Sequence, residues 1–316
     1  MKFRQYIILP ALSLLTVATS CEQQEMPPAA ENDGDVVEII ANIGEVDTRV
    51  AQVSDNLFSF ERGDAIHVVG WYGDDKPWTD TPVKWWNDAT STYNGTRWVT
   101  DPYMRWQNEV TNHFVAWYPT TFADSGSDLT AVEFDLLTAP VRDVLWARKS
   151  QVREDGNNRL QLSFYHMMSR LDVCLKFKGQ YQDVTDVVVL ANMSKSATVN
   201  LVSYSEPYVF PIGKTAVTLT EKTAYASEDY DYSTRDVVIP QDFSELQISF
   251  KYANGKTANL SYKHTNDIDI FPNCHHNLIL TVGADLVTLD EVTVIPWDKE
   301  IIEGGEAEEE MNNLTE

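Results

Sequence analysis

The sequence has little cysteine and little basic charge. Three Cys among 316 residues are too few for a disulfide-dense scaffold. Only 24 basic side chains stand against 48 acidic ones, and the resulting formal net charge of −24 would repel a phosphate backbone. We therefore expect no nucleic-acid partner. The hydrophobic content of 43% and aromatic content of 11% are those of a globular protein with a real core.

Sequence motifs for enzyme chemistry are also missing. The chain contains no Gly-x-Ser-x-Gly elbow, P-loop, Gly-x-Gly-x-x-Gly or His-Glu-x-x-His, and its six His are scattered. Cys274, His275 and His276 are adjacent, but neighbours on a strand point to opposite faces, so they cannot all reach one metal ion. His166 is expected to be a hydrogen-bonded core histidine. We expect no catalysis, no cofactor and no metal site.

Two further candidates for chemistry remain. Cys174 and Cys274 can form a disulfide only if their Cα atoms lie within about 7 Å, and the sequence leaves this open. Residues 228–232 read Glu-Asp-Tyr-Asp-Tyr and offer oxygen ligands for Ca²⁺. They lack the Gly and the spacing of a known calcium loop, so the sequence favours a solvated loop.

The N-terminus has the features of an export signal. Lys2 and Arg4 precede an apolar run over residues 6–18, which is too short to span a bilayer stably. Small residues then precede Cys21, as in a bacterial lipobox, so cleavage before Cys21 would free it to carry acyl chains. An ordinary secretory signal with an incidental Cys is the alternative. The expected segments are a lipoprotein signal peptide over residues 1–20 and a flexible tether over residues 21–35.

Apolar residues at every second position dominate the rest of the chain, which shows no long amphipathic helix. In the first such segment Val37 and Ile39 fall on one face while Glu38 and Asn42 fall on the other, so this strand needs a partner sheet. Short strands at this spacing predict an all-β protein built from β-sandwiches.

The polar stretch 153–159 is either a hairpin loop or, as its near-central position favours, a domain boundary. The tail after Trp297 is acidic and has no basic residue beyond Lys299, which indicates a solvated end. The expected parts are an N-terminal β-sandwich domain over residues 36–155, a C-terminal β-sandwich domain over residues 156–300 and an acidic tail over residues 301–316.

Six short motifs occur in an order that resembles the Bacteroidales fimbrillin-like proteins, the type V pilins and their relatives. The resemblance spans residues 48 to 297. The motifs are Thr48-Arg49 followed by residues 60–68, then residues 114–119, residues 143–147, residues 164–171, residues 239–241 and residues 294–297.

The resemblance implies a surface-exposed outer-membrane lipoprotein with two tandem transthyretin-like (Ig-like) β-sandwich domains. It also implies a fimbrial or cell-adhesion subunit that joins other fimbrial subunits through β-strand addition and can meet host or bacterial surface ligands. In polymerising members an arginine-specific protease removes the first strand, and Arg49 is the matching position here. Arg62 is the competing site, but it precedes Gly63 and Asp64 in an expected tight turn.

The sequence departs from the family in two places. Asn273 stands near a position where relatives commonly have Gly, and Asn can supply the same turn conformation. The tail offers only Ile301 and Ile302 before its acidic run and is a poor donor strand. A tip, anchor or accessory role is therefore at least as well supported as a place in a polymerised shaft.

Tryptophan is distributed unevenly, because eight of the nine Trp precede residue 147. Trp85, Trp86 and Trp98 lie in the polar stretch 74–108 and are candidate glycan contacts, since flat rings on loops can stack on sugar faces. The competing interpretation is that these rings close the end of the first sandwich. The alternative function is a non-polymerising surface lipoprotein that binds glycans through this stretch.

Overall fold

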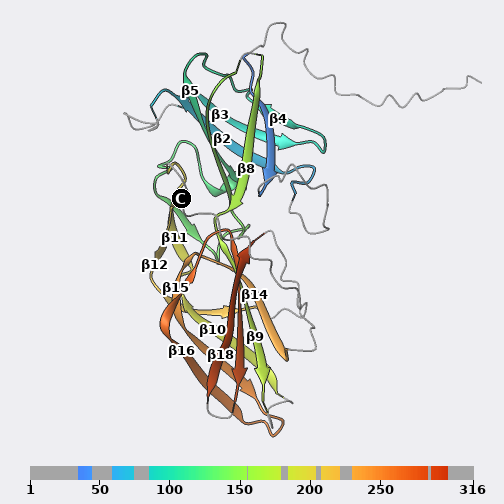
Figure 1. The fold of residues 1–316 in the computed structure, drawn as a ribbon, viewed down its shortest axis with the longest axis vertical. Helices are drawn as coiled ribbons and strands as arrows, with labels where there is room; N and C mark the ends of the chain where they lie inside the picture. The colour runs from blue at the N-terminus through green and yellow to red at the C-terminus, as the bar shows by residue number, and fades with distance from the viewer. Residues whose placement is uncertain are drawn as a thin grey trace, which may run out of the picture. The chain divides into compact units, whose positions relative to one another are not determined.

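The computed structural model describes residues 35–44, 59–74, 85–154, 156–178, 184–203, 208–220, 230–283 and 286–297 (Figure 1). These residues form strands and turns, with one short 3-10 turn, η1 (Thr120–Phe122). The predicted all-β class is confirmed. In this described part no helix is long and apolar enough to cross a membrane.

The first sheet has seven strands in the order β1-β8-β7-β5-β2-β3-β4. Neighbouring strands are antiparallel, except that β1 is parallel to β8. The strands are β1 (Glu38–Ile43), β2 (Ala65–Tyr72), β3 (Asn87–Tyr93), β4 (Trp98–Asp101), β5 (Thr111–Tyr118), β7 (Leu145–Val152) and β8 (Arg159–His166).

Both faces of this sheet are apolar, because successive side chains on a strand point to opposite sides. Val68 and Val69 on β2 are both fully buried, yet they belong to different hydrophobic clusters. The cluster with Val68 includes residues of β1 and β8, and the cluster with Val69 lies against a three-stranded sheet. That second sheet has the order β12-β11-β6 and consists of β6 (Val132–Asp135), β11 (Ser196–Asn200) and β12 (Tyr208–Ile212).

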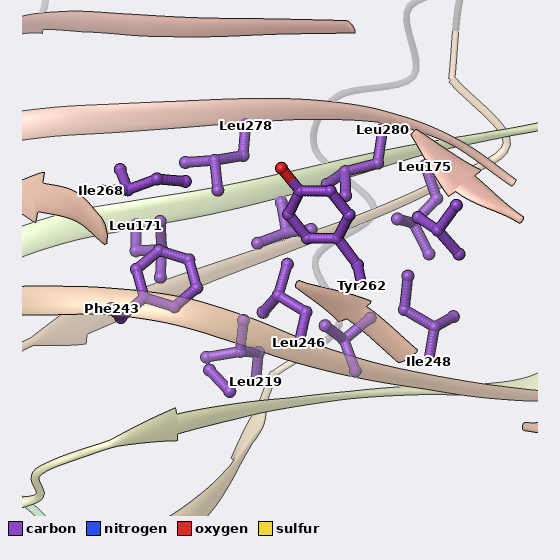
Figure 2. Packing of buried hydrophobic residues seen from close by; sticks show 14 of the residues in the cluster. Leu171, Leu175, Leu219, Phe243, Leu246, Ile248, Tyr262, Ile268, Leu278 and Leu280 are labelled. Carbon is purple, nitrogen blue, oxygen red and sulfur yellow. The ribbon is translucent and has the colours of Figure 1, made fainter. Parts of the chain in front are cut away.

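The remaining strands form two four-stranded sheets around a third hydrophobic cluster, and this packing is that of a β-sandwich. In Figure 2, Phe243, Leu246 and Ile248 of one sheet face Leu278 and Leu280 of the other. One sheet has the order β13-β10-β15-β16, with β10 (Thr185–Met193), β13 (Thr215–Leu219), β15 (Gln241–Lys251) and β16 (Thr257–Ile270). The other has the order β14-β9-β17-β18, with β9 (Ser169–Phe177), β14 (Tyr232–Val238), β17 (Cys274–Val282) and β18 (Val287–Pro296).

The polar stretch 153–159 contains the connection between β7 and β8, which are antiparallel neighbours in the seven-stranded sheet. Of the two alternatives that the sequence allowed, the hairpin loop agrees with this pairing. A domain boundary between residues 155 and 156 would separate β7 from β8 within one sheet. Strands from the second half of the chain also reach the first half, since β11 pairs with β6. The turn before β11 is fixed by Gln241, whose amide accepts from Ser194 N at 2.7 Å and donates to Ser194 O at 3.0 Å.

Three of the sequence motifs, at residues 143–147, 164–171 and 294–297, meet near Asn273 where the chain leaves the seven-stranded sheet. The His166 ring bonds Asp143 through Nδ1 at 2.7 Å and stacks on Trp297 at a centroid distance of 4.6 Å. The prediction of a hydrogen-bonded core histidine is confirmed. Asn273 has φ 56°, so the predicted replacement for Gly in this turn is confirmed as well, and its side-chain oxygen accepts from His166 N at 3.1 Å. These motif residues hold the fold together.

Candidate functional site

The candidate functional site is β1 together with the place that it occupies beside β8 in the hydrophobic cluster with Val68, which we call the groove because removal of β1 would open it. The predicted alternation is confirmed, because Val37 and Ile39 are buried while Glu38 is exposed. Ala41 and Ile43 continue the inward face and pack against the same cluster. On one side β1 pairs with β8, from Glu38 opposite Arg159 to Ile43 opposite Phe164. On its other side β1 is an edge strand, because no second strand of the described chain pairs with it there.

The start of β1 is held more firmly than the rest of the strand. Val36 forms an antiparallel bridge with Arg105, beside which Val37 N donates to Met104 O at 2.9 Å. The Arg153 guanidinium forms an ion pair with Asp35. The ion pair between Glu38 and Arg159, by contrast, is long at 3.8 Å and exposed to solvent, so it contributes little.

The side chains that would line the groove come from β8 and from the segment after β4. Leu160, Leu162 and Phe164 alternate along β8 and are fully buried, and Met104 and Trp106 close the groove near the start of β1. Removal of β1 would expose these side chains and the backbone edge of β8 at once. An open edge beside alternating apolar pockets is the arrangement that binds an added strand.

The two candidate cleavage sites differ in what the structure describes. Arg49 lies outside the described residues, as does Cys21. Arg62 is exposed but lies in a turn tied to its surroundings: Gly63 N donates to Tyr93 O at 2.8 Å, and Asp64 accepts from Glu61 N at 2.7 Å through its carboxylate. A protease would have to open this turn to reach the Arg62 peptide bond.

The structure does not bring the three predicted glycan contacts together. Trp85 is partly buried, tilts against Trp71 at 5.9 Å and donates from Nε1 to Ser125 O at 2.8 Å. Trp98 packs edge-on against Phe60 at 5.0 Å and belongs to the margin of the other cluster. These two rings therefore pack at the margins of two hydrophobic clusters.

Trp86 is the exposed member of the three, and it stands apart from Trp98. Trp86 comes just before the first residue of β3, whereas Trp98 pairs with Tyr93, the last residue of β3. Seven residues of extended chain place their backbones roughly 23 Å apart. Trp86 contacts Tyr72 edge-to-face at 5.3 Å, a partner that the sequence analysis missed. The sequence does contain a signal for this contact. Trp71-Tyr72 and Trp85-Trp86 are pairs of adjacent aromatic residues, and neighbours on an extended chain point to opposite faces, so one ring of each pair is expected on the outer face.

The other chemically interesting side chains are parts of the packing. Cys174 and Cys274 are both free thiols. His275 is buried with Nε2 2.9 Å from a carboxylate oxygen of Asp172, which also receives the Arg235 guanidinium at 2.9 Å. In the described ranges no group of three His, Cys, Asp or Glu side chains could hold a metal ion, and Glu228 and Asp229 of the acidic stretch lie outside those ranges.

A comparison with protein families gives a match to the fimbrillin-like family over residues 48–297. The chain belongs to the fimbrillin-like family. The match covers most of the chain and the six motifs from which the resemblance was inferred. A comparison with curated protein sequences found no match.

Two solved structures have the same fold as this fimbrillin-like chain. A protein from Bacteroides uniformis aligns with a TM-score of 0.56 and 16% identity, covering 84% of this chain and 100% of that one. A protein from Bacteroides ovatus aligns with a TM-score of 0.55 and 16% identity, covering 84% and 99%. The names of both proteins propose a role in cell adhesion. At this identity the likeness shows the fold alone.

Proposed function

We propose that this chain is a fimbrial subunit, or an accessory or tip component of a fimbria, that mediates adhesion at the bacterial cell surface. The observation that carries the proposal is the position of β1, an edge strand that fills an apolar groove of the seven-stranded sheet. Membership of the fimbrillin-like family and the adhesion names of the two similar structures support it. The role is structural, and it involves no catalysis or cofactor.

The proposed assembly step is the replacement of β1 by a strand of another fimbrial subunit. Cleavage after Arg49 would separate β1 from the rest of the chain, since β1 lies N-terminal to that bond. Parallel pairs are slightly less stable per residue than antiparallel ones, so the β1–β8 pair is suited to exchange. An incoming strand gains the free backbone groups of β8 and the pockets that Val37 and Ile39 leave empty.

Attachment to the outer membrane is proposed to occur through acyl chains on Cys21. The reason is the sequence of an apolar run, small residues and Cys at the N-terminus. This protein, extracted from the membranes of its native host, should partition into the detergent phase, and the Cys21→Ser variant should partition into the aqueous phase. The same aqueous behaviour before and after the substitution would contradict the anchor.

Treatment with an arginine-specific protease tests the assembly step. The purified chain should be cut after Arg49, lose the N-terminal fragment and form ladders on gels run after mild heating, with filaments or short oligomers in electron micrographs. Arg49→Ala should stop both the cut and the ladder, while Arg62→Ala, the matched control, should change neither. A first cut at Arg62 would contradict strand exchange. So would a cut at Arg49 after which β1 stays bound and no strand of another subunit is inserted.

A synthetic peptide of residues 35–44 gives a second measurement. The cleaved chain should bind this peptide, because it carries the side chains that fill the groove. A peptide with Ile39→Asp should fail to bind, since it would bury a carboxylate in an apolar pocket. Equal binding of the two peptides would show that the groove does not select the strand.

A further inference from the structure

Three exposed rings, which we call the aromatic patch, lie at the end of β2, just before β3 and in the segment after β4. They are Tyr72, Trp86 and Tyr103, which are 45%, 46% and 57% exposed. Such large side chains are usually mostly buried, so three exposed ones in linked positions are unusual. The seven-stranded sheet does not require them for its core, since Trp71 and Trp85 close the neighbouring cluster.

The aromatic patch is linked through Arg105. Trp86 donates from Nε1 to Arg105 O at 3.2 Å, and the Arg105 guanidinium lies 5.1 Å from the centre of the Tyr103 ring. Asn87 holds the backbone of Arg105 from both sides, accepting from Arg105 N at 2.8 Å and donating to Arg105 O at 2.9 Å. On the other side Tyr72 meets Trp86 at an interplanar angle of 90°. The rings are thus held in place before any ligand binds.

The chemistry of the aromatic patch suits one class of ligand. The Trp86 N–H is directed to a backbone carbonyl, and the face of an aromatic ring carries partial negative charge that attracts the polarised C–H groups of a sugar. The hydroxyls of Tyr72 and Tyr103 can donate to and accept from sugar hydroxyls. The three rings of the patch are all aromatic, and the net charge of −24 disfavours an anionic ligand.

We propose that the aromatic patch binds a neutral carbohydrate, with a sugar ring stacked on Trp86 and sugar hydroxyls bonded by the hydroxyls of Tyr72 and Tyr103. Rigid aromatic rings lose little conformational entropy on binding, so a small prearranged patch is sufficient for weak, repeated contacts. Carbohydrate binding would add a ligand to the surface role proposed above. It does not depend on cleavage at Arg49, so the test of assembly and the test of carbohydrate binding can succeed or fail independently of each other.

Binding of defined oligosaccharides to the uncleaved chain tests the inference. The probes are maltohexaose, cellohexaose, β-1,4-mannohexaose and N-acetylchitohexaose, titrated to millimolar concentration and followed by calorimetry and tryptophan fluorescence. At least one probe should bind, and Trp86→Ala and Tyr103→Ala should each weaken its binding about tenfold or more. Trp86→Phe should keep part of the affinity, because it keeps a ring.

The control is Val99→Ala, which removes an exposed apolar side chain from β4 outside the aromatic patch. It should leave the affinity unchanged, and melting temperatures should show that the variants are folded. If Trp86→Ala unfolds the chain, Tyr103→Ala alone decides, because its ring is the most exposed of the three. Binding of none of the four probes, or binding that survives the loss of the Trp86 and Tyr103 rings, would overturn the inference.

Discussion

Asn273 joins three segments of the chain through one residue. Its backbone N–H donates to Met168 O at 3.0 Å, and its backbone carbonyl accepts from Trp297 N at 3.0 Å. Its side-chain oxygen accepts from His166 N at 3.1 Å. The sequence predicted its turn conformation but not these partners, because they lie far away in the chain and only the tertiary fold brings them to it.

Replacement of Asn273 should separate the backbone effect from the hydrogen bond. Asn273→Ala removes the acceptor for His166 N. It also places Ala at φ 56°, a conformation that Asn tolerates better because its side chain can form local hydrogen bonds. We therefore expect the free energy of unfolding to fall by about 1–3 kcal/mol. Asn273→Gly should lose less, because Gly adopts positive φ without strain. Urea denaturation measures both. If Gly were as damaging as Ala, the backbone conformation would not be the cause.

His276 is a second residue with a testable contribution, and it concerns pH. Burial, followed by the nearby His275, lowers the pKa of His276 from 6.5 to about 4, and its Nε2 accepts from Phe271 N at 3.2 Å. Between these two pH values the unfolded chain takes up a proton at His276 and the folded chain does not. The free energy of unfolding should therefore fall as the pH falls through this window, by up to about 1.4 kcal/mol per pH unit.

The variant His276→Gln isolates this contribution. Gln does not titrate, and its amide oxygen can accept from Phe271 N. Urea denaturation of both proteins at several pH values between 7 and 4 should show a shallower pH dependence for the variant, after both are referred to their stability at pH 8. Parallel curves would mean that His276 is not the titrating group.

At the scale of single elements, alternation predicted the two faces of β1 but not its neighbour. The buried Val37 and Ile39 follow from the period of two, whereas pairing with β8 joins residues more than a hundred positions apart. The same rule applied to Trp85 and Trp86 would have placed these rings on opposite faces of the sheet. The structure places Trp85 against a core and leaves Trp86 exposed.

Neighbouring isoleucines on β1 give a matched pair of variants. Ile39 is 5% exposed and Ile40 is 41% exposed, and they point to opposite faces. Ile39→Ala should lower the free energy of unfolding by about 2–4 kcal/mol, since it leaves a cavity in the groove. Ile40→Ala should change it by no more than about 0.5 kcal/mol. Equal effects in urea denaturation would show that β1 does not occupy the groove in solution.

At the scale of the whole molecule, the sequence predicted the strand content and the family but not how the halves share sheets. A polar, turn-rich stretch at the centre of a chain has the same composition whether it separates two domains or joins two strands. Residues 153–159 do the latter, and the second half contributes β8 to one sheet and β11 to another. Composition reports that a loop is exposed, and it carries no information on which strands the loop connects.

This sharing predicts the behaviour of a chain cut between residues 155 and 156. With a specific protease site inserted there, the nicked protein should remain one species in gel filtration, because β8 stays paired with β1 and β7, and β11 with β6. The isolated fragment 156–316 should expose Leu160 and Leu162, which are fully buried in the intact chain, and should aggregate or lose NMR signal dispersion. Separation of the nicked halves without denaturant, each with dispersed NMR signals, would instead show two domains that fold independently.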